Sequence, residues 1–112
     1  MARATWNGVV LAETDRPVLL EFNVYFPPED VRREYLVKSR GWSLCLWKGL
    51  ARYYTVRAGG QEIKNAAWYY PHPSPLARKI KDHVAFWHGV RVDLANEPLD
   101  EAGGGLTGDR SI

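Results

Sequence analysis

Apolar and polar residues alternate over nine consecutive positions from Val18 to Phe26, and this stretch constrains the fold more than any other. Alternate side chains of a strand point to opposite faces, so Glu21, Asn23 and Tyr25 would share the face away from the core. A period of two is typical of a half-buried β-strand. We therefore predict one continuous strand here, with these residues facing the core: Val18, Leu20, Phe22, Val24 and Phe26.

Two glycine-containing turns indicate hairpins. Asn7-Gly8 accepts the positive φ angles of a type I′ turn, so strands should flank it near Arg3–Trp6 and Val9–Glu13. Ala58-Gly59-Gly60 should join Leu50–Arg57, which is rich in aromatic and β-branched residues, to a returning strand. Two further turns are expected, at Asp15–Pro17 and at Ser39–Gly41. A last strand is expected at Val90–Leu94.

Two segments are predicted to be short helices. The first begins at Pro27-Pro28 and ends near Leu36, because proline is tolerated in a first helical turn and the two acids that follow favour the helix dipole. The second begins at Pro75, with Ser74 as its cap, and Gly89 ends it. The core-facing residues would be Val31 and Tyr35 in the first helix, and Leu76, Ile80, Val84 and Trp87 in the second. We predict a small single α+β domain, mainly antiparallel sheet of about six strands with two short helices.

Length and charge divide the chain into a domain and a tail. At 112 residues, with 46% apolar and 25% charged residues, it can bury a core without a disulfide or a metal. Residues 1–95 carry fourteen Lys and Arg against nine Asp and Glu, whereas residues 96–112 carry four acids and one Arg. We predict a compact domain over residues 3–95 and a Gly-rich acidic tail over residues 96–112, whose composition is typical of disorder.

Composition also excludes several kinds of site. Cys45 is the only cysteine, which rules out an internal disulfide and a Cys-rich zinc site. His83 and His88 are five residues apart and do not form the i, i+4 pair that binds metals on a helix, so we predict no metal and no cofactor. An excess of five positive charges over residues 1–95 is small for a nucleic-acid-binding protein, whose basic residues usually form a stripe, so nucleic acid is not an expected partner.

Hydropathy gives an expectation about location. No apolar run is long enough to span a bilayer, and the first residues do not resemble a signal peptide. We therefore expect a cytoplasmic protein with no membrane partner and a reduced thiol.

The segment Cys45–Tyr54 brings together a thiol, an ammonium group, a glycine and three large aromatic rings. Cys45 and Lys48 are the candidate catalytic residues, since a nearby ammonium favours the thiolate form of a cysteine. On a straight strand their side chains would point to opposite faces, but a turn or bulge at Trp47-Lys48-Gly49 would bring them together. The alternative is a buried cysteine that packs as a small hydrophobe beside a solvated lysine.

The aromatic residues of the Cys45–Tyr54 segment and of the returning strand are the candidates for ligand binding. Aromatic faces stack on planar rings and attract cations, while Lys and Arg attract anions. We expect a small polar, anionic or planar ligand; packing of the same rings in the core, without a ligand, is the alternative. An enzyme that uses Cys45 or Lys48, and a homodimeric scaffold, also stay open. The candidate ligand-binding residues are Glu21, Tyr25, Trp47, Lys48, Arg52, Tyr53, Trp68 and Tyr70.

The order of several motifs between Arg3 and Leu94 carries a family resemblance. These motifs are Trp6-Asn7-Gly8, Tyr25–Val31, Cys45 with Trp47-Lys48-Gly49, Ala51–Tyr54, Ala67–Pro71 and Ile80–Phe86. With them the chain resembles the domain of unknown function 427 family (DUF427), which also carries a nucleotidyltransferase label. The resemblance implies a compact β-rich domain and no established activity. This chain departs from the family pattern at Leu46, where a proline usually follows the cysteine.

The residues themselves give the nucleotidyltransferase label little support. Nucleotidyl transfer needs metal ions held by clustered carboxylates and a backbone cradle for phosphates. Glu29 and Asp30 are adjacent, and the start of a helix already explains them. No Gly-rich loop with a Lys-Ser or Lys-Thr ending precedes an expected helix.

Overall fold

The computed structural model describes residues 1–94 of the chain. The predicted acidic tail, residues 96–112, lies outside the described residues. The strands are β1 (Ala2–Trp6), β2 (Val9–Thr14), β3 (Val18–Leu20), β4 (Asn23–Tyr25), β5 (Leu36–Cys45), β6 (Gly49–Ala58), β7 (Gln61–Tyr69), β8 (Ala85–Phe86) and β9 (Arg91–Leu94). Three short 3₁₀ turns complete the described part: η1 (Pro28–Asp30), η2 (Arg33–Tyr35) and η3 (Pro75–Ile80).

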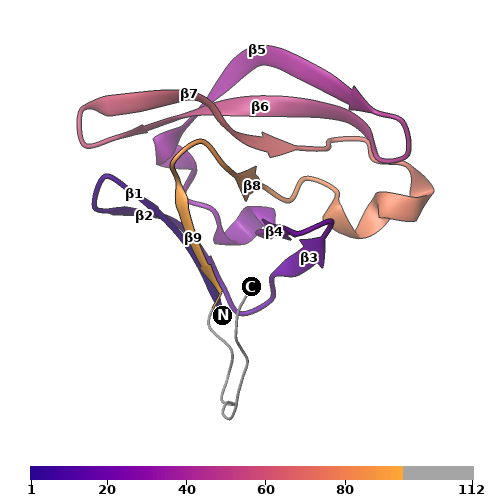
Figure 1. Ribbon diagram of the computed structural model, residues 1–112, viewed down its shortest axis with the longest axis horizontal. Coiled ribbons are helices and arrows are strands. Elements are labelled where there is room, and N and C mark those ends of the chain that lie inside the picture. Colours follow the sequence, from indigo (N-terminus) through magenta and orange to yellow (C-terminus); the bar gives the residue numbers. More distant parts are fainter. Residues whose placement is uncertain (95–112) are drawn as a thin grey trace.

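The nine strands pair antiparallel in three sheets. In the four-stranded sheet of order β5-β6-β7-β8, the first three strands lie across the top of Figure 1 and β8 lies below them. The three-stranded sheet β2-β1-β9 lies below it on one side, and the hairpin β3-β4 lies below it on the other (Figure 1). The predicted fold class, a small β-dominated domain of mainly antiparallel sheet, is confirmed.

The two predicted glycine hairpins are present. Asn7 and Gly8 have φ angles of 53° and 76°, as a type I′ turn requires, and they join β1 to β2. The Asn7 Nδ2 group also donates a hydrogen bond of 2.9 Å to the carbonyl of Ala58 at the end of β6. The first hairpin is thereby fastened to the four-stranded sheet.

The continuous strand predicted from Val18 to Phe26 is wrong, because a tight turn at Glu21 and Phe22 divides it into β3 and β4. Both turn residues have positive φ angles, 52° and 67°, and Phe22 is fully exposed instead of facing the core. Tyr25, predicted to face away from the core, is fully buried, and so is its neighbour Phe26. Adjacent residues of one strand point to opposite faces, so this part of the chain has core on both sides.

The two predicted helices are only 3₁₀ turns, because the chain around them pairs with strands. At the first, Val31 forms an isolated antiparallel bridge with Ala12, and the Arg32 amide donates to the Leu11 carbonyl at 2.8 Å. Because this segment pairs with β2, it does not continue into a second helical turn. Val31 and Tyr35 therefore do not share one face of a helix, as was predicted.

The second predicted helix ends at Ile80 for the same reason. The Asp82 amide donates to the Tyr70 carbonyl at 3.0 Å, and Val84 and Phe26 exchange backbone hydrogen bonds of 2.8 and 2.9 Å. Leu76, predicted to face the core, is 82% exposed. The Ser74 side chain makes no cap hydrogen bond.

The turn predicted at Ser39–Gly41 is wrong, since these residues lie within β5. The pairing of β5 with β6 shifts register between Lys38 and Trp42, as at a β-bulge. The Ser39 hydroxyl donates to the side-chain oxygen of Asn65 in β7, which fastens the irregular segment to the sheet.

The core has two parts. The Phe26 cluster packs the three-stranded sheet against β6, β7 and β8, and its largest fully buried side chains are Phe26, Leu11, Val56 and Val84. The Tyr25 cluster packs the β3-β4 hairpin and η3 against the other end of the four-stranded sheet. Its buried members are Tyr25, Ala51, Trp68, Tyr70, Ala77, Ile80 and Ala85.

Candidate functional site

A cavity of about 170 Å³ lies within the Tyr25 cluster, against β6 and β7. Five of the predicted ligand-binding residues line it: Tyr25, Lys48, Tyr53, Trp68 and Tyr70. They come from β4, β6, the end of β7 and the loop between β5 and β6, so only the tertiary structure brings them together.

The loop between β5 and β6 turns the Lys48 side chain inward. Cys45 pairs with Gly49, which has a φ angle of 116°, so a three-residue loop ending at Lys48 joins the two strands. The loop is held in place because Ser74 donates to it twice, from its amide to the Lys48 carbonyl at 2.9 Å and from its hydroxyl to the Trp47 carbonyl at 2.5 Å. A turn is thus present at residues 46–48, and Lys48 is buried, with 7% of its surface exposed, so the alternative of a solvated lysine is wrong.

Glu21, in the turn between β3 and β4, forms an ion pair with the buried Lys48. Its Oε1 atom accepts a hydrogen bond from Lys48 Nζ, and its Oε2 atom accepts one of 3.0 Å from the Trp47 indole. The Lys48 ammonium also lies 5.5 Å from the ring centroid of Trp47 and 5.7 Å from that of Tyr70. Cation–π attraction therefore adds to the ion pair.

The ion pair keeps both groups charged at neutral pH. Burial is the largest influence on Lys48 and lowers its pKa, but the Glu21 hydrogen bond and the nearby phenols of Tyr70 and Tyr25 together outweigh it, so the pKa is raised. Hydrogen bonds from Lys48 and Trp47 lower the pKa of Glu21.

Two buried phenols face the same cavity. The Tyr25 hydroxyl accepts a hydrogen bond of 3.3 Å from the Trp68 indole, and the two rings meet edge to face with centroids 6.2 Å apart. The Tyr70 side chain is only 6% exposed, and its hydroxyl has no hydrogen-bond partner within residues 1–94. Burial raises the pKa of Tyr70 to about 12 and also raises that of Tyr25, so both phenols keep their protons at neutral pH.

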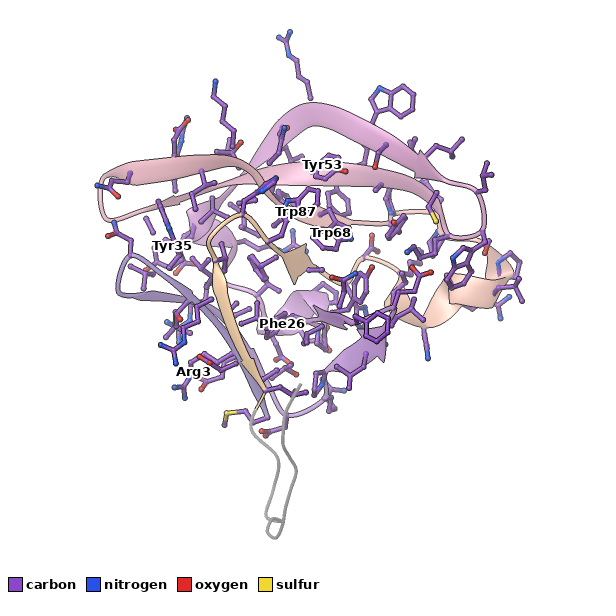
Figure 2. All side chains as sticks on the ribbon, in the orientation of Figure 1. Arg3, Phe26, Tyr35, Tyr53, Trp68 and Trp87 are labelled. Carbon is purple, nitrogen blue, oxygen red and sulfur yellow. The ribbon has the colours of Figure 1, made fainter. Side chains whose placement is uncertain are left out.

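Three aromatic rings form one wall of the cavity (Figure 2). The rings of Tyr53 and Trp87 are nearly parallel, with an angle of 7° and centroids 6.2 Å apart. Trp87 also meets Trp68 edge to face at 5.0 Å, and its indole donates to the Asn65 carbonyl at 2.6 Å. Trp87 is 42% exposed, so it stands where the cavity opens to solvent.

Sequence reasoning missed four lining residues: Asn23, Ser43, Ala51 and Trp87. Asn23 could have been found, because it alternates with Tyr25 on one face of the strand. Ser43 pairs with Ala51 across the sheet, and its hydroxyl lies 2.8 Å from that of Tyr53, but this follows only from the register of β5 and β6. Trp87 was assigned to a helix, and its amide instead donates to the Ala66 carbonyl in β7.

Four other predicted site residues do not line the cavity. Arg52 is exposed and lies on the face of β6 opposite Tyr53, which follows from the alternation of the strand. Glu21 and Trp47 reach the cavity only through Lys48. Cys45 is partly buried at the base of the same loop and packs against the Tyr25 cluster.

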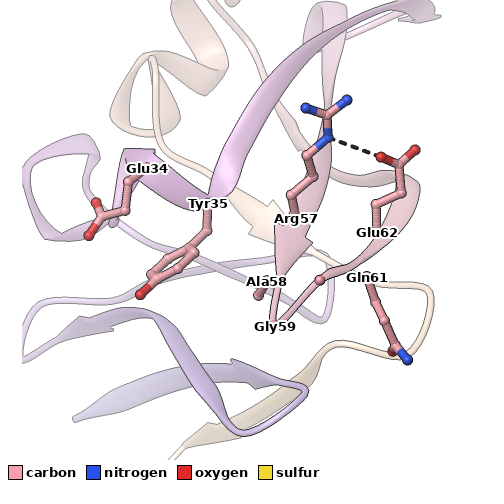
Figure 3. Close-up of a pocket in the computed structure, with 8 residues that line it drawn as sticks. Glu34, Tyr35, Arg57, Ala58, Gly59, Gln61 and Glu62 are labelled. Atoms are coloured by element: carbon pink, nitrogen blue, oxygen red, sulfur yellow. Dashed lines mark hydrogen bonds and ion pairs between the residues drawn. The ribbon is translucent and has the colours of Figure 1, made fainter.

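A larger hollow of about 530 Å³ lies at the turn between β6 and β7 (Figure 3). It contains none of the predicted site residues. The charged side chains that line it are exposed, and Arg57 is paired with Glu62 at 3.0 Å. It therefore lacks buried polar side chains such as Lys48 and Tyr70, which line the cavity in the Tyr25 cluster.

Within residues 1–94, no three side chains of His, Cys, Asp or Glu gather closely enough to hold a metal ion. In the same range, no helix has the length and apolar character needed to cross a membrane. A family model described as a domain of unknown function (DUF427) matches residues 1–97 of the chain. No curated protein matches the chain.

Proposed function

Because the chain belongs to the DUF427 family, whose description assigns no activity, we infer its function from the site and propose that it is a binding module for a small polar ligand. The observation that carries this proposal is the cavity of about 170 Å³ in the Tyr25 cluster. The buried Lys48 ammonium and the Tyr70 hydroxyl, which has no hydrogen-bond partner within residues 1–94, line it together with aromatic rings.

The polar groups distinguish this cavity from simple core packing. Ligand sites typically combine apolar and aromatic walls with a few polar groups that fix orientation. A buried polar group without a partner costs about 1–3 kcal/mol, and a hydrogen bond from Tyr70 to a ligand would recover part of that cost. A core selected for stability alone would carry phenylalanine at this position.

The size of the cavity limits the ligand. Sites for drug-sized molecules usually measure about 300–1,000 Å³, and this cavity measures about 170 Å³. It fits a molecule of the size of a single substituted ring. A nucleoside triphosphate is too large, which argues against nucleotidyl transfer at this site.

The alternative of an enzyme that uses Lys48 or Cys45 has less support. An amine must lose its proton to act as a nucleophile, and the raised pKa of Lys48 opposes that. The ion pair with Glu21 also favours a role for Lys48 as a fixed positive charge. If Cys45 is not a nucleophile, it should react with iodoacetamide at neutral pH no faster than a cysteine in an unfolded peptide, and a much faster reaction would favour the enzyme.

Self-association is a second candidate function, favoured by exposed apolar residues on β5. Trp42 and Leu44 are 63% and 64% exposed, and β5 is an edge strand of its sheet. Unpaired edges readily pair with another chain. Light scattering of the wild type and of Trp42→Glu tests this: a dimer that the substitution dissociates supports it, and a monomer at high concentration rules it out.

Filling the cavity tests the binding proposal. Ala51 lines the cavity and Ala58 lines the hollow at the turn between β6 and β7, and both are buried alanines of β6. A panel of single-ring compounds is titrated while amide and indole NMR resonances are followed at a temperature where all variants are folded. We expect Ala51→Val to abolish the perturbations near Trp68 and Trp87, and Ala58→Val to leave them unchanged.

The opposite pattern would place the ligand at the other hollow and overturn the proposal. An absence of perturbation by any compound at millimolar concentration would favour core packing as the sole role of these rings.

A further inference from the structure

The hydrogen-bonding groups of the cavity indicate which class of ligand it takes. We propose that the ligand is a small planar carboxylate, and that its carboxylate replaces that of Glu21 on Lys48. This inference rests on the proposed function, since it concerns the same cavity.

The buried groups that line the cavity are mainly donors. The Lys48 ammonium has three N–H groups, and one of them bonds to Glu21. The Tyr70 hydroxyl has no partner within residues 1–94. The Tyr25 hydroxyl accepts from Trp68, and its own proton has no acceptor in the same range. A matching ligand must therefore supply acceptor oxygens, and a carboxylate supplies two of them without a competing donor.

The charge of the lining favours a single negative charge. Lys48 is the only cationic residue that lines the cavity in the described part of the chain. Phosphate carries nearly two charges at neutral pH and is usually held by several donors from Arg, Lys or backbone amides. One ammonium with neutral phenols matches a monoanion better.

The walls favour a flat molecule. The rings of Tyr53, Trp68 and Trp87 line a space of about 170 Å³. Aromatic faces and edges pack closely on a planar ring. An aromatic monocarboxylate satisfies the charge, the donors and the walls together.

Glu21 already holds a carboxylate where that of the ligand would bind. Its side chain is 46% exposed, whereas that of Lys48 is 9% exposed, so the glutamate approaches from the solvent side. Once released, Glu21 becomes hydrated at little cost because it lies at the surface. It also lies in a turn with two positive φ angles at non-glycine residues, each of which costs about 1–2 kcal/mol, so the turn is under strain in this arrangement. An incoming carboxylate takes over the Lys48 donor, and the displaced Glu21 leaves the Trp47 indole.

If Glu21 and the ligand compete for Lys48, the direction in which a Glu21 substitution changes the affinity for the ligand can be predicted. Removing the charge of Glu21 should tighten the binding of a carboxylate, whereas removing a true ligand contact would weaken it. The probes are benzoate, its neutral analogue benzamide, and the cation benzylamine. Each is titrated into the wild type, Glu21→Gln and the control Glu62→Gln, whose carboxylate pairs with Arg57 away from the cavity.

We expect benzoate to bind Glu21→Gln about tenfold more tightly than the wild type, which corresponds to about 1.4 kcal/mol for the lost competitor. Benzamide should change by less than twofold, and Glu62→Gln should behave as the wild type. The Trp47 indole resonance, assigned with Trp47→Phe, should shift on addition of benzoate because its hydrogen bond to Glu21 is lost. Lys48→Met should lose benzoate binding at least tenfold while still binding benzamide.

Two results would overturn the carboxylate assignment and leave the binding module in place: weaker benzoate binding by Glu21→Gln, or tighter binding of benzylamine than of benzoate by the wild type. The first would mean that Glu21 supports the bound carboxylate instead of competing with it, and the second would make Glu21 a contact for a cation. If none of the three probes perturbs resonances of Trp68 or Trp87, the carboxylate assignment and the proposed function fail together.

Discussion

The Phe26 cluster and the Tyr25 cluster take their names from adjacent residues that point to opposite sides of the chain, and they differ in the polar groups that they bury. In the Phe26 cluster the one buried phenol, Tyr54, accepts a hydrogen bond of 3.4 Å from Arg33. The Tyr25 cluster lies beside a buried ammonium and lines a cavity, and it includes the Tyr70 hydroxyl, which has no hydrogen-bond partner within residues 1–94.

This difference indicates that the Phe26 cluster mainly stabilises the fold, whereas the Tyr25 cluster is the better candidate for binding a ligand. Burial of apolar side chains without a cavity contributes directly to the free energy of folding. Buried donors beside a cavity lower that contribution, and such local conflicts are expected mainly at functional sites. The contrast therefore supports the proposal that the Tyr25 cluster, and not the rest of the core, is the site.

The largest expected effect comes from emptying the Phe26 cluster. Phe26 is fully buried, so Phe26→Ala should cost about 3–5 kcal/mol of unfolding free energy in urea titrations. Phe22→Ala is a matched control, because Phe22 is fully exposed and should change stability by less than about 0.5 kcal/mol. Equal losses in the two variants would contradict the division of the strand into β3 and β4.

Alkaline pH should act on the Tyr25 cluster and spare the Phe26 cluster. Burial raises the pKa of Tyr70 from 10.0 to about 12, so the folded protein holds this proton more tightly than the unfolded chain. This contribution to stability is fully present below pH 10 and is lost as the pH rises through about 12. We expect the urea midpoint to fall over this range, and to fall less in Tyr70→Phe; an identical fall in both would contradict the assignment to Tyr70.

The two phenols of the Tyr25 cluster should respond differently to loss of the hydroxyl. Tyr25→Phe removes the acceptor of the Trp68 indole and should cost about 1–2 kcal/mol. Tyr70→Phe removes a buried hydroxyl that has no partner within residues 1–94, so stability should stay within about 0.5 kcal/mol of the wild type or rise. A loss of more than about 1 kcal/mol in Tyr70→Phe would show that its hydroxyl is satisfied, and would remove one support for the ligand.

The smallest expected effect is at Arg52, which sequence reasoning placed in the site. Arg52 is exposed on the opposite face of β6, so Arg52→Gln should leave both benzoate binding and the thermal midpoint unchanged. A loss of binding comparable to that of Lys48→Met would mean that the site extends to the outer face of the sheet.

Local patterns predicted most of the sheet and much of the site. The hairpin at Asn7-Gly8 follows from local backbone preference, because few other residue pairs accept two positive φ angles. The concentration of aromatic residues in β6 and at the end of β7 identified Tyr53, Trp68 and Tyr70 as candidates, but the register that pairs Tyr53 with Trp68 came from the tertiary structure. The turn at Glu21 and Phe22 could not be found this way, because neither residue type favours a positive φ angle.

The amino-acid sequence by itself determined a small β-rich domain with an aromatic, lysine-containing segment, because strand alternation and turn preferences are properties of neighbouring residues. Only the tertiary structure decided that Lys48 is buried against Glu21, and that Trp87 joins Tyr53. Those contacts depend on the backbone pairing that replaced the helices and on a strained turn, and they connect residues more than 25 positions apart. These contacts are stabilised by packing and hydrogen bonds between residues far apart in the sequence, and patterns of neighbouring residues contain no information about them.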